Sequence, residues 1–244
     1  MKVDILAFGV HPDDVELGCS GTLIACVAQG KKVAVIDLTR GELGTRGTAD
    51  TRKTEAANAA KVMGVHAREN LEMADGFFQN DEANIRKVIT ALRKYRPEIV
   101  LCNAPEDRHP DHGRSSKLVA DAAFLSGLRK IETSLDGKHQ EIWRPAYVFH
   151  YIQDRYIEPD FVVDISNVFE QRMEAVKSYT TQFYNPGNED DGPQTYISTP
   201  DFLESVISRA RMMGKKIGVK YGEGFNTKKI LGVKNMDSLI LMET

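Results

Sequence analysis

The chain has 244 residues, of which 41% are hydrophobic and 27% charged, with a formal net charge of −3 at pH 7. These values exclude a disordered or fibrous protein and suit one α/β domain with a single sizeable core, spanning residues 1–244. Because the net charge is negative, the composition indicates no general basic surface, and we expect neither a nucleic-acid partner nor membrane binding.

The N-terminus and the cysteines indicate where the protein works. Only about eight apolar-leaning residues precede the charged sequence His11-Pro12-Asp13-Asp14, too few for a signal peptide or a membrane span. The three cysteines, Cys19, Cys26 and Cys102, are odd in number and lack metal-ligand spacing. They predict reduced thiols, so we expect a cytoplasmic protein.

Strand and helix patterns alternate along the first half of the chain. The predicted elements are a strand at 3–10, a helix at 16–29, a strand at 32–38, a helix that is capped by Asp50 or Thr51 and ends at Met63, a strand at 68–71, a helix at 81–95, a strand at 98–102 and a helix at 111–128. This order predicts a Rossmann-like, open and mostly parallel sheet with helices on both faces.

The C-terminal third departs from that alternation and predicts a smaller portion of strands and helices. Strands are expected at 146–152 and 161–165, and helices at 168–179 and 200–213. The acidic, turn-rich sequence at 184–193 is typical of a mobile loop or lid. The sequence contains no internal repeat, which favours a single domain.

Two strand ends are each followed by a cluster of histidine and aspartate residues: His11, Asp13 and Asp14 after the first strand, and His109, Asp111 and His112 after the strand at 98–102. Either cluster alone has an equally good structural explanation, such as Asp111 capping a helix. Both clusters together, at the edge where open α/β sheets bind ligands, favour a functional site.

Two imidazoles and one carboxylate can hold a catalytic Zn²⁺ and leave one position open for water, which predicts a metal-dependent hydrolase. A nucleotide-binding oxidoreductase is an alternative on the same sheet. It is disfavoured because the first loop offers carboxylates in place of the Gly-x-Gly-x-x-Gly pattern that phosphates require. A metal-binding protein without turnover is a third interpretation, and it would have no need of Asp13 or His109.

A family resemblance sharpens this interpretation. The motifs Val10-His11-Pro12-Asp13-Asp14 and His109-Pro110-Asp111-His112 resemble the LmbE-like (PIG-L) family of zinc-dependent N-acetylglucosaminyl deacetylases. Further segments resemble the bacillithiol-biosynthesis branch, which removes acetate from N-acetylglucosaminyl-malate: Leu38–Thr48, Asp75–Phe78, Pro105–Arg108 and Gly218–Phe225. The resemblance implies a sugar-conjugate substrate and a homo-oligomer. Another N-acetylglucosamine conjugate, such as a chitooligosaccharide or a glycolipid precursor, is the alternative substrate.

The same resemblance implies a role for each motif residue. The zinc ligands would be His11, Asp14 and His112, and Fe²⁺ or Co²⁺ also suits such a site. Asp13 matches the general base that takes a proton from the zinc-bound water. His109 matches the residue that stabilises the tetrahedral intermediate and protonates the leaving amine, and Asp111 matches the carboxylate that orients it.

Three further residues are substrate-binding candidates. Arg52 matches a family arginine that contacts the sugar hydroxyls, although its pattern equally fits a solvated helix arginine. Asp75, in the loop after the third strand, is a second sugar-binding candidate. Arg108 is placed to bind the malate carboxylates through a bidentate contact, unless it pairs with Glu106 or Asp107 instead.

One position departs from some relatives. The relatives that act on mycothiol precursors have a tyrosine two residues before the position of His109, where this chain has Asp107. If a tyrosine polarises the substrate carbonyl here, it must come from elsewhere in the chain. Tyr184 and Tyr196 are the two candidates.

Overall fold

The computed structural model describes residues 1–184 and 192–240. The loop predicted at 184–193 therefore falls, over residues 185–191, outside the described residues. The described strands are β1 (Ile5–Gly9), β2 (Val33–Thr39), β3 (Ala67–Met73), β4 (Ile99–Asn103), β5 (Ser134–Leu135), β6 (Lys138–His139), β7 (Tyr147–Tyr151), β8 (Phe161–Asp164) and β9 (Gly222–Thr227).

The described α-helices are α1 (Asp14–Ala28), α2 (Ala49–Met63), α3 (Glu82–Tyr95), α4 (Pro110–Leu125), α5 (Phe169–Lys177) and α6 (Pro200–Lys216). Short 3-10 helices lie at η1 (Ser166–Val168), η2 (Tyr196–Ser198) and η3 (Met236–Leu239). The element order confirms the alternating first half and the smaller C-terminal portion of strands and helices that the sequence predicts.

Seven strands form one sheet in the order β3-β2-β1-β4-β7-β9-β8. The pairs from β3 to β7 are parallel, and β9 runs antiparallel to both β7 and β8. Strands β5 and β6 form a separate hairpin. The predicted Rossmann-like, mostly parallel α/β fold is confirmed.

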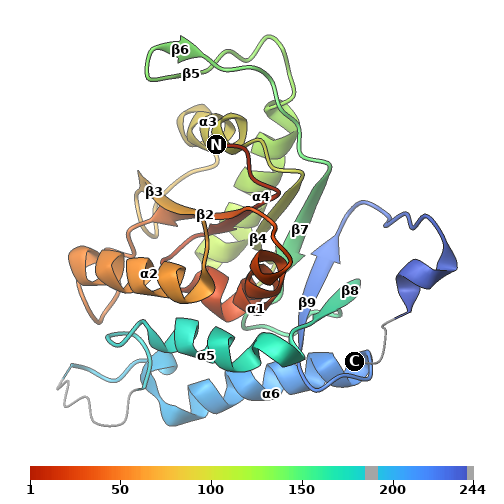
Figure 1. The fold of residues 1–244 in the computed structure, drawn as a ribbon. Coiled ribbons are helices and arrows are strands. Elements are labelled where there is room, and N and C mark those ends of the chain that lie inside the picture. The colour runs from red at the N-terminus through yellow and green to blue at the C-terminus, as the bar shows by residue number, and fades with distance from the viewer. Residues whose placement is uncertain (185–191, 241–244) are drawn as a thin grey trace.

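Alternation along the strands explains why helices cover both faces of the sheet. In β1, Leu6 and Phe8 pack into the core shared with α3 and α4, whereas Ile5 and Ala7 pack against α1 on the opposite face. Figure 1 shows α3 and α4 on one side of the sheet and α1 and α2 on the other, with α5 and α6 packed beyond them. The central strands β1, β2 and β4 are therefore buried on both faces, as parallel strands commonly are.

Helix α1 lies unusually close to the sheet. A Cβ atom on Gly18 would lie only 2.2 Å from the ring of Tyr151, so the glycine allows the helix to approach β7. The hydroxyl of Tyr151 donates to the main-chain oxygen of Phe8, at 2.9 Å. This packing fixes the position of α1, and with it the position of Asp14 at its first turn.

Helix α2 and strand β9 differ from the sequence prediction, and the short hairpin of β5 and β6 was not predicted either. Helix α2 begins at Ala49 and is capped by Thr48 because the side chains of Thr48 and Thr51 each accept a hydrogen bond from the other's main chain. Strand β9 was not predicted, because its sequence Gly222-Glu223-Gly224 has no apolar alternation. Pairing with β7 and β8 on both sides stabilises it instead.

The segment after β9 extends away from the rest of the fold (Figure 1). It carries six exposed apolar side chains: Ile230, Leu231, Val233, Met236, Leu239 and Ile240. Among the described residues, no helix has the length and apolar character needed to cross a lipid bilayer.

Candidate metal centre and active site

The two histidine and aspartate clusters meet at the carboxyl edge of the sheet. Strands β1 and β4 are parallel neighbours, so the loops that follow them lie side by side. Strand β2 lies on one side of β1 and strand β4 on the other, so the strand order reverses at β1. This edge of the sheet is therefore the topological switch point, where such folds bind ligands. Helix α1 begins at Asp14 and α4 at Pro110, so both helices start at this crevice.

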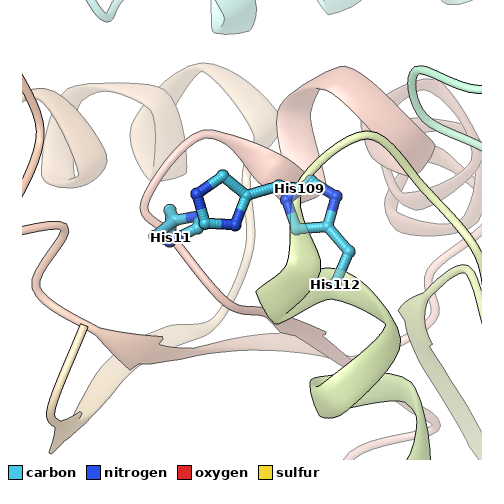
Figure 2. Close-up of side chains that lie close together, drawn as sticks. All are labelled: His11, His109 and His112. Atoms are coloured by element: carbon cyan, nitrogen blue, oxygen red, sulfur yellow. The ribbon is translucent and has the colours of Figure 1, made fainter. Parts of the chain in front are cut away.

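Three imidazoles converge there, as Figure 2 shows. The ring centroids are 4.7 Å apart for His11 and His109, 5.4 Å for His109 and His112, and 5.8 Å for His11 and His112. Among the described residues, ligand atoms of these three histidines lie within 4.8 Å of one another, and so do those of His11, Asp75 and Asp111.

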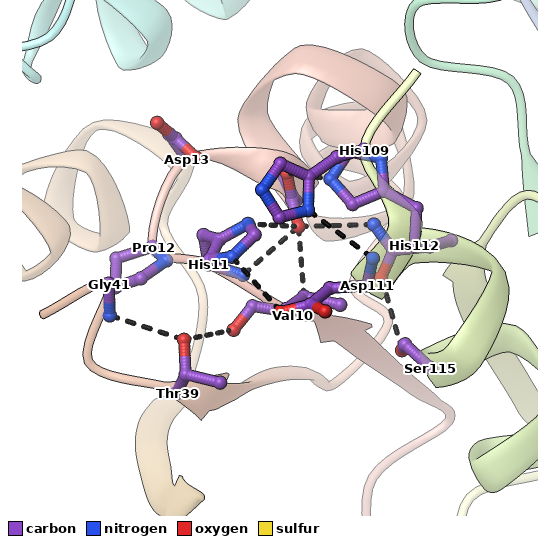
Figure 3. Close-up of polar contacts among 12 residues, drawn as sticks. Val10, His11, Pro12, Asp13, Thr39, Gly41, His109, Asp111, His112 and Ser115 are labelled. Atoms are coloured by element: carbon purple, nitrogen blue, oxygen red, sulfur yellow. Dashed lines mark hydrogen bonds and ion pairs between the residues drawn. The ribbon is translucent and has the colours of Figure 1, made fainter. Parts of the chain in front are cut away.

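The carboxylate of Asp14 lies between the rings of His11 and His112, both of which are labelled in Figure 3. Its Oδ2 is 3.6 Å from Nδ1 of His11, and its Oδ1 is 3.2 Å from Nε2 of His112. Four donors hold it: the main-chain amides of Val10 and His11 and the side-chain amides of Asn103 and Gln153. Burial would raise the pKa of Asp14, but the charges and hydrogen bonds of His112 and His11 hold it well below its usual value.

Each of the two rings beside Asp14 contacts another carboxylate through its far nitrogen. Nε2 of His11 is 2.9 Å from Asp75, and Nδ1 of His112 is 2.6 Å from Asp107. Burial favours the neutral form of both rings, but these acidic partners outweigh it. The hydrogen bonds to Asp14 and Asp75 raise the pKa of His11 to about 9, and the charge of Asp14 and the bond to Asp107 raise that of His112 to about 10.

This arrangement fits a divalent metal ion. Two imidazole nitrogens face one ionised carboxylate, and each ring is oriented from behind by an acidic side chain, as metal-ligating histidines commonly are. The raised pKa values of His11 and His112 show that the buried carboxylates attract positive charge to this position. A metal cation would supply that charge in place of two protons.

Asp13 lies next to this cluster in a constrained conformation. Its backbone φ is +133°, a value that residues other than glycine rarely adopt. Its carboxylate accepts a hydrogen bond from Arg52 at 2.9 Å, and Arg52 also donates to the main-chain oxygen of Pro12. Burial raises the pKa of Asp13 to about 7 in spite of the nearby guanidinium. A pKa raised in this way would suit a general base.

His109 caps α4, and its Nδ1 accepts a hydrogen bond from the main-chain amide of Asp111. The Asp111 carboxylate does not make the contact with the His109 ring that the sequence suggested. Its fully buried side chain instead accepts from the amide of Gly76 at 2.9 Å and from Arg114 at 2.5 Å. Burial, together with the charges of His11 and His112, lowers the pKa of His109.

A cavity of about 350 Å³ opens over these groups, within the range of sites for small molecules. Every sequence-predicted site residue except Asp111 lines it: His11, Asp13, Asp14, Arg52, Asp75, Arg108, His109 and His112. Asp111 lies buried beneath the site. The structure thus brings the candidates of both motifs together with Arg52, Asp75 and Arg108 around one cavity.

The rim of the cavity combines Arg108 with Tyr196. The Arg108 guanidinium lies 4.5 Å from the centre of the Tyr196 ring. Both side chains bond to Asp154, Arg108 at 2.8 Å and the Tyr196 hydroxyl at 3.1 Å. Arg108 therefore pairs with Asp154 and not with the two acidic neighbours that the sequence suggested. Of the two tyrosine candidates, Tyr196 lines the cavity and Tyr184 is not among its described lining residues.

Sequence reasoning missed the residues that hold the cluster from outside. Asn103 ends β4 and Gln153 follows β7, so both stand at the same edge of the sheet as the motif residues. Their position at the ends of predicted strands is the signal from which the sequence could have identified Asn103 and Gln153 as site residues. The sequence offered no signal that Asp107 contacts His112, since their pairing depends on the loop conformation.

Comparison with known proteins agrees with this geometry. A family model described as PIG-L, GlcNAc-PI de-N-acetylase, matches residues 6–123, the part of the chain that carries both histidine motifs. An uncharacterised deacetylase of Escherichia coli, YaiS, is 44% identical over 167 residues, which cover 62% of this chain and 83% of that protein.

Two relatives with named substrates are more distant. The diacetylchitobiose deacetylase of Thermococcus kodakarensis is 28% identical over 90% of this chain and 81% of its own length. A probable N-acetyl-α-D-glucosaminyl L-malate deacetylase of Bacillus subtilis is 26% identical over 75% of this chain and 84% of its own.

Among solved structures, a conserved protein from Thermus thermophilus has a TM-score of 0.83 and 36% identity, covering 95% of this chain and 98% of that one.

The geometry predicts which histidines are needed for metal binding. His11→Ala and His112→Ala should lose most of the bound metal, because each removes an imidazole that faces Asp14. His109→Ala is the matched control and should keep it. Elemental analysis of the purified variants measures the metal content per chain. Loss of metal from all three variants would instead identify the three-imidazole cluster as the ligand set.

A second prediction concerns protons. At pH 7 both His11 and His112 should be protonated in the metal-free protein, because their pKa values are raised to about 9 and about 10. Metal binding at pH 7 should therefore release about two protons, and the apparent affinity should fall as the pH falls. Calorimetry in buffers of different ionisation enthalpy counts these protons. Binding without proton release would contradict the assignment of the two rings as ligands.

Proposed function

Because this chain belongs to the PIG-L family of GlcNAc-PI de-N-acetylases, we propose that it is a metal-dependent hydrolase that removes the acetyl group from an N-acetylglucosamine conjugate. The observation that carries this proposal is the position of Asp14, which lies between two imidazoles in the cavity that Asp13 and His109 also line. A site that only bound a metal would not need those last two side chains.

We propose that His11, Asp14 and His112 hold the metal, with zinc as the first choice and iron or cobalt as substitutes. When bound, the ion would polarise the amide carbonyl of the substrate and make water a stronger acid. The four donors on Asp14 keep its oxygens aimed between the two rings. Such fixed ligands reduce the reorganisation that metal binding requires.

Asp13 is the general base of the proposed reaction. It lies in the cavity directly before the ligand Asp14 in sequence, and Arg52 fixes its carboxylate. A carboxylate whose pKa is raised towards neutrality accepts the proton of an attacking water more readily than one with an ordinary pKa. Because the proposed base Asp13 is adjacent to the proposed ligand Asp14, the proton would be removed close to the oxygen that attacks the substrate.

His109 is the second catalytic group that we propose. The centroid of its ring lies 4.7 Å from the centroid of the His11 ring. The His109 side chain lines the cavity on the side of α4. In that position it would stabilise the charge that develops on the substrate oxygen and donate a proton to the departing amine. The amide of Asp111 holds the ring through Nδ1, which leaves Nε2 available for the substrate.

Two substrates fit the family. N-acetylglucosaminyl-malate, the substrate of the bacillithiol branch, carries carboxylates that need a cation, and Arg108 is the rim residue best placed to supply it. A neutral chitooligosaccharide is the second candidate. The salt bridges favour it, because Arg108 is already paired with Asp154 and Arg52 with Asp13.

Sugar recognition is the remaining part of the proposal. We propose that Arg52 and Asp75 bind the sugar hydroxyls from the cavity wall, which both of them line. Each also contacts the catalytic machinery, Arg52 through Asp13 and Asp75 through His11. Tyr196 is the tyrosine that we propose for contact with the substrate carbonyl, since it lines the same cavity.

We also propose a cytoplasmic homo-oligomer. The three cysteines are free thiols, which suits a reducing compartment. We propose that a second copy of the chain covers the exposed apolar side chains between Ile230 and Ile240. Sedimentation at several protein concentrations measures the assembly, and a monomer throughout would contradict it.

Replacing the proposed base separates catalysis from binding. Asp13→Asn keeps the shape of the side chain but cannot accept a proton, so kcat for deacetylation should fall by roughly 10²–10⁴ while the metal stays bound. Release of primary amine from N-acetylglucosamine conjugates measures the rate, and elemental analysis checks the metal. Near-normal turnover would exclude Asp13 as the base.

Arg108 distinguishes the two candidate substrates. Arg108→Ala removes a charge-assisted contact, which is worth roughly ten- to a hundredfold in kcat/KM. We expect this loss for N-acetylglucosaminyl-malate and little change for N-acetylglucosamine, with diacetylchitobiose assayed alongside. An equal loss on all three would show that Arg108 supports the site itself. A wild type that prefers diacetylchitobiose would favour the neutral substrate.

A further inference from the structure

We infer that Asp107 is a positioning residue for the metal ligand His112, and that it sets the affinity of the metal without touching the substrate. The inference rests on the proposed metal-dependent function. It concerns a position at which some relatives of the family carry a different residue type, so the role cannot simply be carried over from the motif.

The contact between the two side chains is short and buried. Oδ2 of Asp107 lies 2.6 Å from Nδ1 of His112, and the Asp107 side chain is only 1% exposed. A charge-assisted hydrogen bond of this kind is strong, since water does not compete for it. The ring of His112 is therefore restrained at the nitrogen that faces away from Asp14.

The other oxygen of Asp107 is fixed by the main chain. Oδ1 accepts hydrogen bonds from the amide of Arg108 at 2.8 Å and from the amide of Arg155 at 2.7 Å. The first amide belongs to the loop after β4, and the second to the segment after β7. One carboxylate thus joins two loops and a metal ligand, so its own position is well determined.

This geometry determines which nitrogen of His112 can bind a metal. With a proton on Nδ1, donated to Asp107, the lone pair lies on Nε2, the atom 3.2 Å from Oδ1 of Asp14. A carboxylate behind an imidazole fixes both its tautomer and its orientation, and it makes the ring a better ligand. Loss of such a partner typically weakens metal binding by about 10- to 100-fold.

Asp75 makes the equivalent contact with His11 but cannot be tested as cleanly. Asp75 lines the cavity, so its substitution would change both metal binding and substrate binding. Asp107 is not among the described residues that line the cavity. Its removal should therefore change metal affinity through His112, whereas any effect on the substrate would pass through the loop amide of Arg108.

The test measures metal affinity directly. Zn²⁺ titrations in competition with a chromophoric chelator give the dissociation constants of wild type, Asp107→Ala, Asp107→Asn and Asp154→Asn. We expect about 10- to 100-fold weaker binding for Asp107→Ala and a smaller loss for Asp107→Asn, whose amide oxygen can still accept from Nδ1. Asp154→Asn is the matched control, because Asp154 lies in the same loop region and contacts Arg108 and Tyr196 but no proposed ligand.

A second readout separates positioning from general stability. The metal-free Asp107→Asn protein should lose some thermal stability, because the variant replaces a buried carboxylate that accepts from His112 and from two main-chain amides. The readout is therefore the increase in thermal midpoint that Zn²⁺ produces, which should be smaller than in the wild type. The ligand-field absorption of the Co²⁺ form should also change in this variant. Equal Zn²⁺ affinity and an unchanged Co²⁺ spectrum in Asp107→Asn and wild type would overturn the role of Asp107. A wild type without metal affinity would overturn the metal centre itself.

Discussion

The pairing of β1 with β4 is the constraint on which the rest of the site depends. Ile5, Leu6 and Ala7 lie beside Ile99, Val100 and Leu101 in parallel register, so the two strands end at the same edge of the sheet. Residues about a hundred positions apart in the sequence thereby face one cavity. Helices α1 and α4 begin there too, and their N-terminal dipoles favour the anionic form of a carboxylate such as Asp14.

The charge of the site follows from this convergence. Carboxylates surround the imidazoles of His11 and His112, with Asp14 between the rings and Asp75 and Asp107 behind them. So many buried acids favour positive charge nearby, and they raise the pKa values of both rings. The same groups that favour protonation at neutral pH would favour a divalent cation, so proton and metal compete for one position.

The sequence predicted the fold where local pattern determines the structure. The apolar strands β1, β2 and β4 and the polar residues that follow them are visible because both signals are short-range. Strand β9 was missed because its glycines carry no pattern and its stability comes from its neighbours. For the same reason the sequence predicted which side chains would meet but not all of their partners. The contact of Asp107 with His112, and of Arg108 with Asp154, depends on how two loops lie against each other.

The backbone conformation of Asp13 has a consequence for how this chain tolerates change. A φ of +133° costs a residue with a side chain on the order of 1–3 kcal/mol, and a glycine would adopt it with far less strain. Replacing Asp13 with glycine would therefore relieve the strain but would remove the carboxylate that the proposed reaction needs. A locally unfavourable residue thus stands where the proposed chemistry needs a carboxylate. This is a stability–activity trade-off at a single position.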